Sequence, residues 1–190
     1  MSRALSRSRG GATDVHSLRL RTLELAALAL VVALPGCAGA RAAANSSRSP
    51  REVRTMVDDG TTGPAIDRFQ YAGQWSHVTA RRDGRTLGTS SRSARAGDAA
   101  TISFAGTRIR LYGVLGDRGG VGSMQLDGQP AGTADFYAPH VAGNALVFES
   151  SELAPGRHEL VVSVAGARDP ASGGNYVNVD GAVVTESEQR

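Results

Sequence analysis

Short segments in which every second residue is large and apolar recur from about Asp58 onward, and Gly-rich turns separate them. Ile102 and Phe104 alternate in one segment, and Leu160 and Val162 alternate in another. Because side chains along a strand point to opposite faces in turn, this spacing is typical of strands with one buried face. Outside the first forty residues, Gly or Pro interrupts every helical i, i+3, i+4 pattern. We therefore predict an all-β domain, a two-sheet antiparallel β-sandwich of eight or nine strands over about 130 residues.

Two turns are expected to set the strand order. Asp127-Gly128 is flanked by alternating apolar residues, and this dipeptide favours a two-residue hairpin because both residues tolerate positive φ. Gly106-Thr107 separates the segments 99–105 and 108–113 and is expected to join them in a tight turn.

The charge of the chain gives no sign of a nucleic-acid partner. The formal net charge is +3, but five of the 21 basic residues and two of the 18 acidic ones precede residue 37, so 16 of each follow. The neutral remainder lacks the basic surface that nucleic-acid binding requires.

The first 36 residues are typical of a helical secretory signal peptide. Arginines precede the apolar run Leu25–Leu34, and small residues follow it. Ten apolar residues are fewer than the roughly 20 that a membrane-spanning helix needs. The segment 34–37 (LPGC) resembles the lipobox of bacterial lipoproteins, although Pro35 departs from the usual small or hydroxylated residue. The resemblance implies that Cys37 becomes the lipidated first residue of the mature protein.

A lipid anchor at Cys37 predicts an exported protein, held to a membrane of the cell envelope and facing the periplasm or the exterior. The alternative is an ordinary leader cleaved at residues 38–40 (AGA), with an incidental cysteine. Residues 37–58 are small and polar, so we expect a flexible linker there, followed by the β-sandwich over 59–187.

Several motifs of the expected sandwich resemble a known family. They are Phe69–Trp75 (FQYAGQW), Ile102–Gly113 (ISFAGTRIRLYG), Gly122–Gly128, Leu153–Leu160 (LAPGRHEL) and Ser172–Gly181 (SGGNYVNVDG). Together they are similar to the galactose-binding-like jelly-roll modules that accompany secreted glycoside hydrolases and other bacterial surface proteins. The resemblance implies carbohydrate binding, often with a structural Ca²⁺. The same class also includes members that bind proteins or lipids, or that only space domains.

Polar side chains in Gly-rich loops are the candidate ligand-binding groups, because a hydroxyl array needs paired donors and acceptors beside an aromatic face. One loop follows residue 115, a second spans 137–144, and a third contains residues 168–170 and 175–176. The alternative is that these loops are solvated turns. Tyr112 is a further candidate, because it lies on the outward phase of its strand, opposite Ile109 and Leu111. The predicted ligand-binding residues are therefore Tyr112, Asp117, Arg118, Tyr137, His140 and Asn144.

Two other residues invite a function. Trp75, the only tryptophan, is a possible sugar platform, but packing at the sandwich edge is the favoured interpretation. Val177, Val179 and Val183 are expected on one face of the last strand, and Asp180 lies on the opposite phase. Asp180 is a candidate Ca²⁺ ligand, or else accepts backbone hydrogen bonds at a bulge formed with Gly181.

Catalytic motifs are absent from the sequence. The histidines are scattered, and neither a Gly-x-Ser-x-Gly elbow nor a His-Glu-x-x-His motif occurs. We therefore expect a protein that binds carbohydrate through the loops of the sandwich and is not an enzyme. The alternatives are a protein-binding or spacer role for the same sandwich and, least favoured, a hydrolase with an unfamiliar site.

Overall fold

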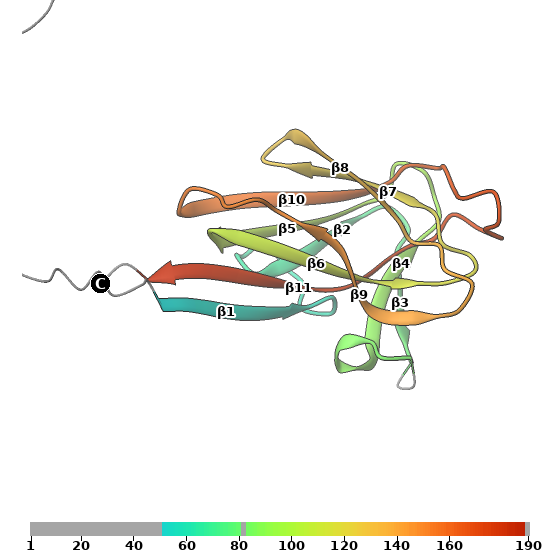
Figure 1. Cartoon of the computed structure of the whole chain (residues 1–190), viewed down its shortest axis with the longest axis horizontal. Helices are drawn as coiled ribbons and strands as arrows, with labels where there is room; N and C mark the ends of the chain where they lie inside the picture. Colours follow the sequence, from blue (N-terminus) through green and yellow to red (C-terminus); the bar gives the residue numbers. More distant parts are fainter. Residues whose placement is uncertain (1–50, 81–82, 189–190) are drawn as a thin grey trace, which may run out of the picture. The chain divides into compact units, whose positions relative to one another are not determined.

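Two antiparallel β-sheets enclose one hydrophobic core (Figure 1). This computed structural model describes residues 51–80 and 83–188. One sheet has the order β3-β4-β11-β6-β9, with β1 also paired to β11, and the other has the order β2-β5-β10-β7-β8. The predicted all-β sandwich is therefore confirmed, but the described part of the chain has eleven strands where eight or nine were predicted. These are β1 Arg51–Asp58, β2 Arg68–Ala72, β3 Ser76–Thr79, β4 Thr89–Ser93, β5 Ala99–Gly106, β6 Arg108–Leu115, β7 Val121–Leu126, β8 Gln129–Asp135, β9 Ala142–Glu149, β10 Gly156–Val164 and β11 Val177–Glu188, and Thr86–Gly88 forms a short 3₁₀ turn.

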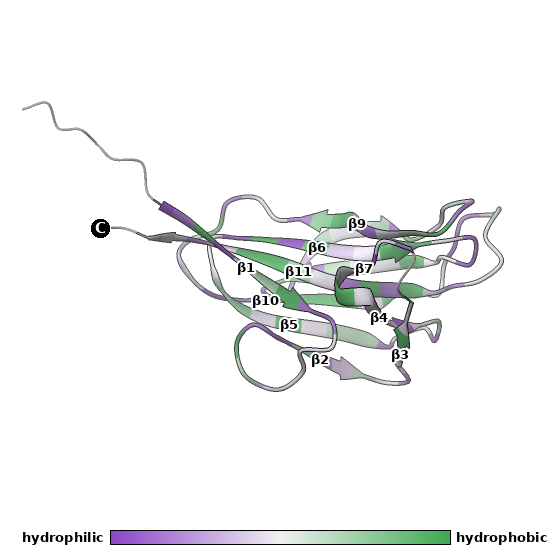
Figure 2. Cartoon of the chain, turned by 90° about the horizontal axis from the view of Figure 1, so that it is seen from below, coloured by the Kyte–Doolittle hydropathy of each residue, from purple (hydrophilic) through white to green (hydrophobic). Residues whose placement is uncertain are grey.

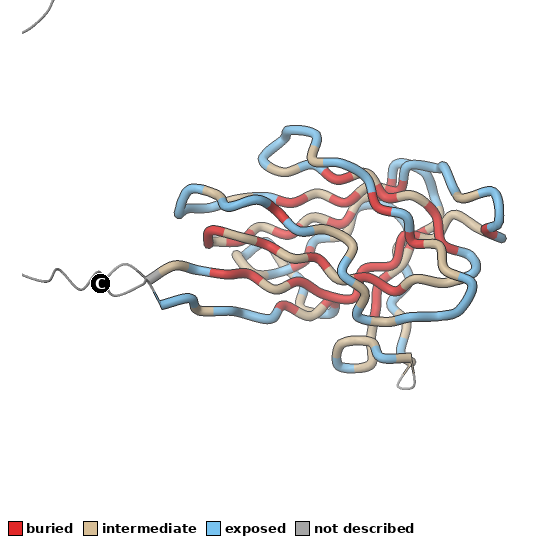
Figure 3. The backbone as a smooth tube through the Cα atoms, viewed as in Figure 1, coloured by how far each residue is buried: buried red, intermediate tan, exposed pale blue. Residues whose placement is uncertain are grey.

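The core consists of the inward residues of both sheets, as the alternating pattern predicts. Every second residue is buried along β5, along β6 as far as Gly113, and along β10 from Leu160 onward. Phe104, Ile109 and Leu160 are fully enclosed. Figure 3 shows the buried segments along the strands and the exposed segments in the connecting loops. The sandwich is therefore a rigid frame that displays its loops.

The two predicted turns have different outcomes. Leu126 pairs with Gln129 across Asp127 and Gly128, whose φ angles of 52° and 74° fit a type I′ hairpin, so this turn is confirmed. Gly106-Thr107 joins β5 to β6 but not as a hairpin, because the two strands belong to different sheets. The Thr107 N–H instead donates to the Thr185 carbonyl of β11.

The predicted linker boundary at residue 58 is wrong, because residues 51–58 form β1. This strand pairs with residues 181–188 of β11 along its whole length. β11 has twelve residues, and β4 covers only Val177–Val179 on that edge, so β1 completes the pairing. Figure 2 shows β1 starting hydrophilic and ending hydrophobic. An edge strand with only Val57 buried resembles a polar linker in sequence.

A bulge in β11 also overturns the predicted phase of Val183. The register with β6 shifts between Val179 and Gly181, so two residues of β11 face one of β6. Val179 faces the core before the bulge, and Ala182 and Val184 face it afterwards, while Val183 turns outward and is only partly buried.

The predicted signal peptide (1–36), the lipidation site Cys37 and the linker up to residue 50 lie outside the described residues. Within the described part of the chain, no helix is long and apolar enough to cross a membrane.

Candidate functional site

Two loops are hydrogen-bonded to each other where β6 ends and β11 begins. The β6–β7 loop contains residues 116–120, and the β10–β11 loop contains residues 165–176. The Gly173 N–H donates to the Asp117 carbonyl at 2.8 Å, and the Tyr176 N–H donates to the Arg118 carbonyl at 3.0 Å. The Gly120 N–H returns a bond to the Tyr176 carbonyl at 2.9 Å. These bonds fix the backbone positions of Asp117, Arg118 and Tyr176 relative to one another.

Ser172 fastens the same two loops from inside. Its side chain is buried, and its Oγ lies 2.6 Å from the Gly119 carbonyl, to which it donates. The same Oγ accepts the Gly174 N–H at 3.2 Å. A buried hydroxyl with both a donor and an acceptor partner is satisfied, so this contact stabilises the loop pair.

Gly119 and Gly120 allow neighbouring backbone segments to approach the β6–β7 loop closely. A Cβ on Gly119 would lie 1.9 Å from the Phe136 carbonyl oxygen, and a Cβ on Gly120 would lie 2.5 Å from the Asn175 carbonyl carbon. Both neighbours are backbone atoms, so neither can yield as a flexible side chain would. The Gly-rich loop that the sequence suggests as a ligand contact is therefore also required for packing.

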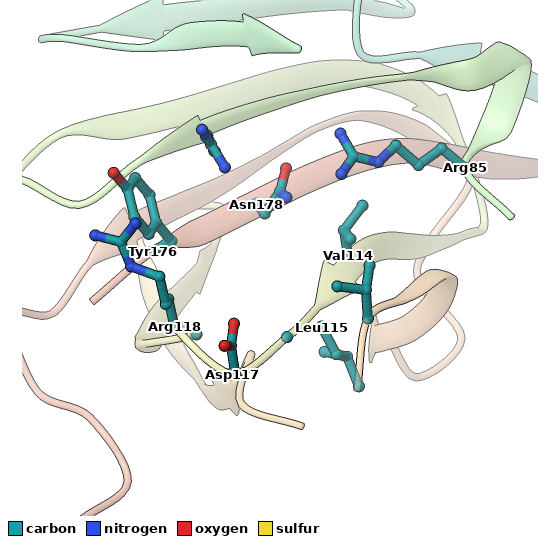
Figure 4. A pocket seen from close by; sticks show the side chains of 11 residues that line it. Arg85, Val114, Leu115, Asp117, Arg118, Tyr176 and Asn178 are labelled. Carbon is teal, nitrogen blue, oxygen red and sulfur yellow. The ribbon is translucent and has the colours of Figure 1, made fainter. Parts of the chain in front are cut away.

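A pocket of about 100 Å³ lies beside the joined loops (Figure 4). Figure 4 shows Arg118 beside the Tyr176 ring, Arg85 on the other side of the pocket and Asn178 between them. The pocket is lined by Arg85, Arg92, Val114, Leu115, Gly116, Asp117, Arg118, Gly119, Val141, Tyr176 and Asn178.

Tyr176 is the aromatic residue in the lining of this pocket. The guanidinium carbons of Arg92 and Arg118 lie 4.8 Å and 5.1 Å from the centroid of its ring. These distances are within the range of cation–π attraction, which holds both side chains near the ring. Arg92 comes from β4, where it pairs with Asn178 of β11, so three separate segments meet here.

Asn178 is 7% exposed, and its Oδ1 is buried without a hydrogen-bond partner among the described residues. Buried polar side-chain atoms are hydrogen-bonded in most proteins, and exceptions often mark a functional site or a missing ligand or water. The side chain borders the pocket, so a group bound there can satisfy the amide.

Arg85 has a different environment from the other two arginines. Its Nε donates to Asp83 at 2.8 Å, and its Nη1 donates to Ser90 at 2.7 Å. The side chain is 8% exposed. Because Nε and Nη1 are engaged within the protein and the charge is paired with Asp83, Arg85 forms part of the pocket wall.

A second, more open pocket of about 430 Å³ adjoins the first. Arg92 and Tyr176 line both pockets. Trp75 lines the second, where its Nε1 donates to the Ala72 carbonyl and its ring packs 5.1 Å from the Tyr71 ring. The preferred interpretation of Trp75 as an edge residue is confirmed, because it packs against the core.

The structure places two of the six predicted ligand-binding residues in the first pocket. Asp117 and Arg118 line it, whereas the other four residues line neither pocket. Tyr112 is partly exposed on β6, opposite Leu146. Tyr137 forms an isolated parallel β-bridge with Gly116, the first residue of the β6–β7 loop.

The other two predicted residues, His140 and Asn144, are exposed. Asn144 has a φ of 52°, and its backbone N–H donates to the Asp180 carboxylate.

The sequence reasoning missed Arg92 and Asn178. Tyr176 belongs to the third candidate loop, but its role was not distinguished there. Asn178 lies between two core valines of β11, a position that signals only the outward phase of a strand. Arg92 lies in β4 (TSSRS), which has no apolar alternation, so no sequence signal marks it.

Asp180 does not fit a Ca²⁺ site. It is fully buried, and its two carboxylate oxygens accept the backbone N–H groups of Thr86 at 2.8 Å and Asn144 at 2.7 Å. Ca²⁺ requires six to eight oxygen ligands. No cluster of three metal-binding side chains occurs among the described residues. The alternative of backbone hydrogen bonding at a bulge with Gly181 describes this residue.

Burial raises the pKa of Asp180 to about 6, although its two backbone hydrogen bonds favour the charged form. Nearby Asp59 raises this pKa further, and Arg85 lowers it. The carboxylate joins the 3₁₀ turn to β9.

A Ser-His-Asp combination occurs elsewhere, but its arrangement is not that of a catalytic triad. Ser91 donates to Asp59 and contacts the Nδ1 of His77. In a triad the histidine lies between the serine and the carboxylate, and the serine reaches the substrate. Here the serine lies in the middle and is fully buried.

Comparison with known proteins finds similar chains but assigns no family. No protein-family model matches the chain. Over 94 residues it is 30% identical to "A type blood alpha-D-galactosamine galactosaminidase" from Flavonifractor plautii, a match that covers 50% of this chain and 8% of that protein. The chain thus spans less than a tenth of this curated relative.

Solved structures align with this chain at low sequence identity. A xanthan lyase from Paenibacillus aligns over 70% of this chain and 13% of its own, with a TM-score of 0.50 and 11% identity. A two-domain esterase active on acetylated mannans aligns over 75% of this chain and 38% of its own, with a TM-score of 0.48 and 12% identity. The CBM36-1 domain of a multidomain xylanase, from the hindgut metagenome of Trinervitermes trinervoides, aligns over 73% of this chain and all of its own, with a TM-score of 0.43 and 14% identity. The alignment with xanthan lyase shows that this β-sandwich recurs within a larger protein.

Proposed function

We propose that the β-sandwich binds carbohydrate without cleaving it, at the pocket formed by Tyr176, Arg92, Arg118, Asp117 and Asn178. The observation that carries the proposal is the convergence of polar groups around one partly exposed aromatic ring. Sugar recognition needs an apolar face for the ring and oriented donors and acceptors for the hydroxyl groups. The Tyr176 ring supplies the first, and the side chains around it supply the second.

A non-enzymatic role agrees with the carboxylates of the site. Most glycoside hydrolases use two carboxylates that flank the scissile bond. Asp117 is the one acidic residue among the described residues that line this pocket. The names of the galactosaminidase and xanthan lyase relatives support a carbohydrate ligand, because binding modules commonly accompany such enzymes within one chain.

The test is a glycan-array screen of the purified protein, followed by titration of each hit. Tyr176→Ala should abolish retention of the hit while leaving the melting temperature nearly unchanged. Tyr112→Ala is the matched control, because this tyrosine is also partly exposed but lines neither pocket. Absence of any glycan hit from a folded protein would overturn the proposal and favour the protein-binding or spacer alternative.

We propose in addition that Cys37 carries the lipid that anchors the chain at the cell envelope. The proposal rests on the apolar run before Cys37 and on the lipobox-like segment LPGC. In a bacterial host, Cys37→Ala should prevent incorporation of labelled palmitate and release the protein from the detergent phase into the aqueous phase. An unlabelled native chain with a mature N-terminus beyond residue 37 would instead establish an ordinary cleaved leader.

A further inference from the structure

We infer that the ligand is an anionic oligosaccharide that lies across both pockets, with its carboxylate or sulfate group at Arg92 and Arg118. The inference rests on the proposed function and specifies the class of glycan. It starts from the charge of the lining. Arg92 and Arg118 line the first pocket and Arg95 lines the second. The one acid in either lining is Asp117, and the charge of Arg85 is offset by Asp83. Because the chain after residue 36 is neutral overall, this excess of positive charge is local.

Arg92 and Arg118 have no acidic partner among the described residues, in contrast to three arginines that do. Arg85 pairs with Asp83, Arg108 pairs with Glu152 and Arg110 pairs with Glu149. The two pocket arginines contact the Tyr176 ring instead. A guanidinium is weakly hydrated and presents its donors in a planar fork that matches carboxylate and sulfate geometry. Two such forks beside one ring are therefore ready to receive an anion.

Asn178 indicates that the anion belongs to a sugar. Its buried Oδ1 lacks a donor, and a sulfate or chloride ion has no proton to give it. A sugar hydroxyl can donate a proton to this oxygen. It can do so directly, or after an amide flip that interchanges Oδ1 and Nδ2. Arginines for a charged group and an amide for a hydroxyl together fit an acidic sugar.

The second pocket indicates that the ligand has more than one sugar unit. A pocket of about 100 Å³ is small compared with the roughly 300 to 1,000 Å³ of typical small-molecule sites. The neighbouring pocket of about 430 Å³ shares Arg92 and Tyr176 with it and adds Trp75. A chain of at least two sugars can therefore place its acidic unit against Tyr176 and the next unit toward Trp75.

The experiment is calorimetric titration of the full chain with tetragalacturonate, with the carboxyl-reduced neutral tetrasaccharide and with a sulfated galactose tetrasaccharide. We expect the neutral compound to bind at least tenfold more weakly than at least one acidic compound. The two acidic compounds distinguish a preference for carboxylate from one for sulfate. Galacturonate monosaccharide should bind at least tenfold more weakly than the tetrasaccharide, which tests the second pocket without altering Trp75.

Arg92→Gln and Arg118→Gln should each weaken binding of the acidic compound at least tenfold. Arg54→Gln is the matched control, because it removes the same charge from exposed β1 and should leave affinity unchanged. Equal binding of neutral and acidic tetrasaccharides would overturn the inference and leave the proposed function standing. An equal loss in Arg54→Gln would also overturn it, by showing general charge attraction. If none of these compounds and no array glycan binds, both proposals fail.

Discussion

The ring of Phe136 occupies the space that a side chain at position 113 would need. A Cβ on Gly113 would lie 2.6 Å from Cε1 of this ring. Phe136 is fully buried, its carbonyl accepts the Gly116 N–H, and its N–H donates to the Gly120 carbonyl. One core residue therefore connects the packing of β6 to the loop that carries Asp117 and Arg118.

Gly113→Ala should destabilise the sandwich. The added methyl group meets the Phe136 ring and also lies 2.9 Å from the Asn178 carbonyl oxygen, which is backbone and cannot yield easily. Overpacking of this kind costs about 1 to 3 kcal/mol of unfolding free energy, measurable by urea denaturation. Gly156→Ala is the control: a Cβ there has open space, so its effect should stay within about 0.5 kcal/mol. Equal stability of the two variants would contradict the packing described here.

Ser172→Ala should weaken glycan binding although Ser172 touches no ligand in the proposed site. The variant loses the hydrogen bond to the Gly119 carbonyl, so the two loops that place Arg118 and Tyr176 are held less firmly. We expect the unfolding free energy to fall by about 1 kcal/mol and glycan affinity to fall severalfold. Amide hydrogen exchange at Gly119 and Gly120 should become faster.

Ser123→Ala is the matched control for that change. Its hydroxyl makes only a long hydrogen bond of 3.4 Å to the Ser163 carbonyl, between β7 and β10, and does not join the two loops to each other. Unchanged affinity in Ser172→Ala, together with the expected loss of stability, would show that this serine supports the fold but not the site.

The sequence predicts the core strands well because their signal is local. Alternation in β5, β6 and β10 and the Asp127-Gly128 turn depend on neighbouring residues only. β1 was assigned to the linker because its pairing with β11 lies more than a hundred residues away in sequence. An edge strand can remain polar on its exposed face, so its composition does not distinguish it from a linker.

The candidate site was only partly predictable for a related reason. Asp117 and Arg118 were recognisable as polar residues in a Gly-rich loop. Arg92 and Asn178 become neighbours only through the β4–β11 register, which no local pattern encodes. The bulge at Asp180 reverses the phase of the rest of β11, so strict alternation predicts the wrong face for Val183.

Because of Asp180, we expect the free energy of unfolding to fall as the pH rises from 4 to 6. Burial raises its pKa in the folded state from 3.8 to about 6, so the folded protein binds more protons than the unfolded chain in this window. This contribution to stability is fully present below the unfolded pKa and is lost as the pH rises through 6. A pKa difference of this size corresponds to at most about 3 kcal/mol. Burial also raises the pKa of Asp59, which acts in the same direction.

Asp180→Asn tests the raised pKa of Asp180. The quantity to compare is the slope of the unfolding free energy against pH and not the absolute stability, because the amide has one oxygen acceptor where the carboxylate has two. The unfolding free energy of the variant should depend less steeply on pH between 4 and 6 than that of the native chain. A carboxyl carbon NMR titration of Asp180 should give a midpoint near 6. A midpoint near 4 with unchanged slopes would show that the two backbone N–H donors outweigh burial.

We expect His158 to make the stability of the sandwich depend on pH in a second, higher range, at a position outside the proposed site. Burial disfavours the charged ring, but Nδ1 lies 2.8 Å from Asp127 Oδ2 and Nε2 lies 2.8 Å from the Ala154 carbonyl, and these contacts raise its pKa above 6.5. Only the protonated ring can donate at both nitrogens. The stabilisation is therefore fully present below pH 6.5 and is lost as the pH rises through the folded pKa.

His158→Gln should accordingly destabilise the protein more at pH 6 than at pH 8.5. The difference should be about 1 kcal/mol, because Asp127 is partly exposed and solvent screens the pair. His140→Gln is the control for the substitution itself, since this histidine is exposed and lies away from Asp127. Chemical denaturation of the three proteins at both pH values measures the effect. An equal loss at pH 6 and pH 8.5 in His158→Gln would mean that the ring stabilises the sandwich by packing on Phe104, 5.5 Å away between centroids, and not by its charge.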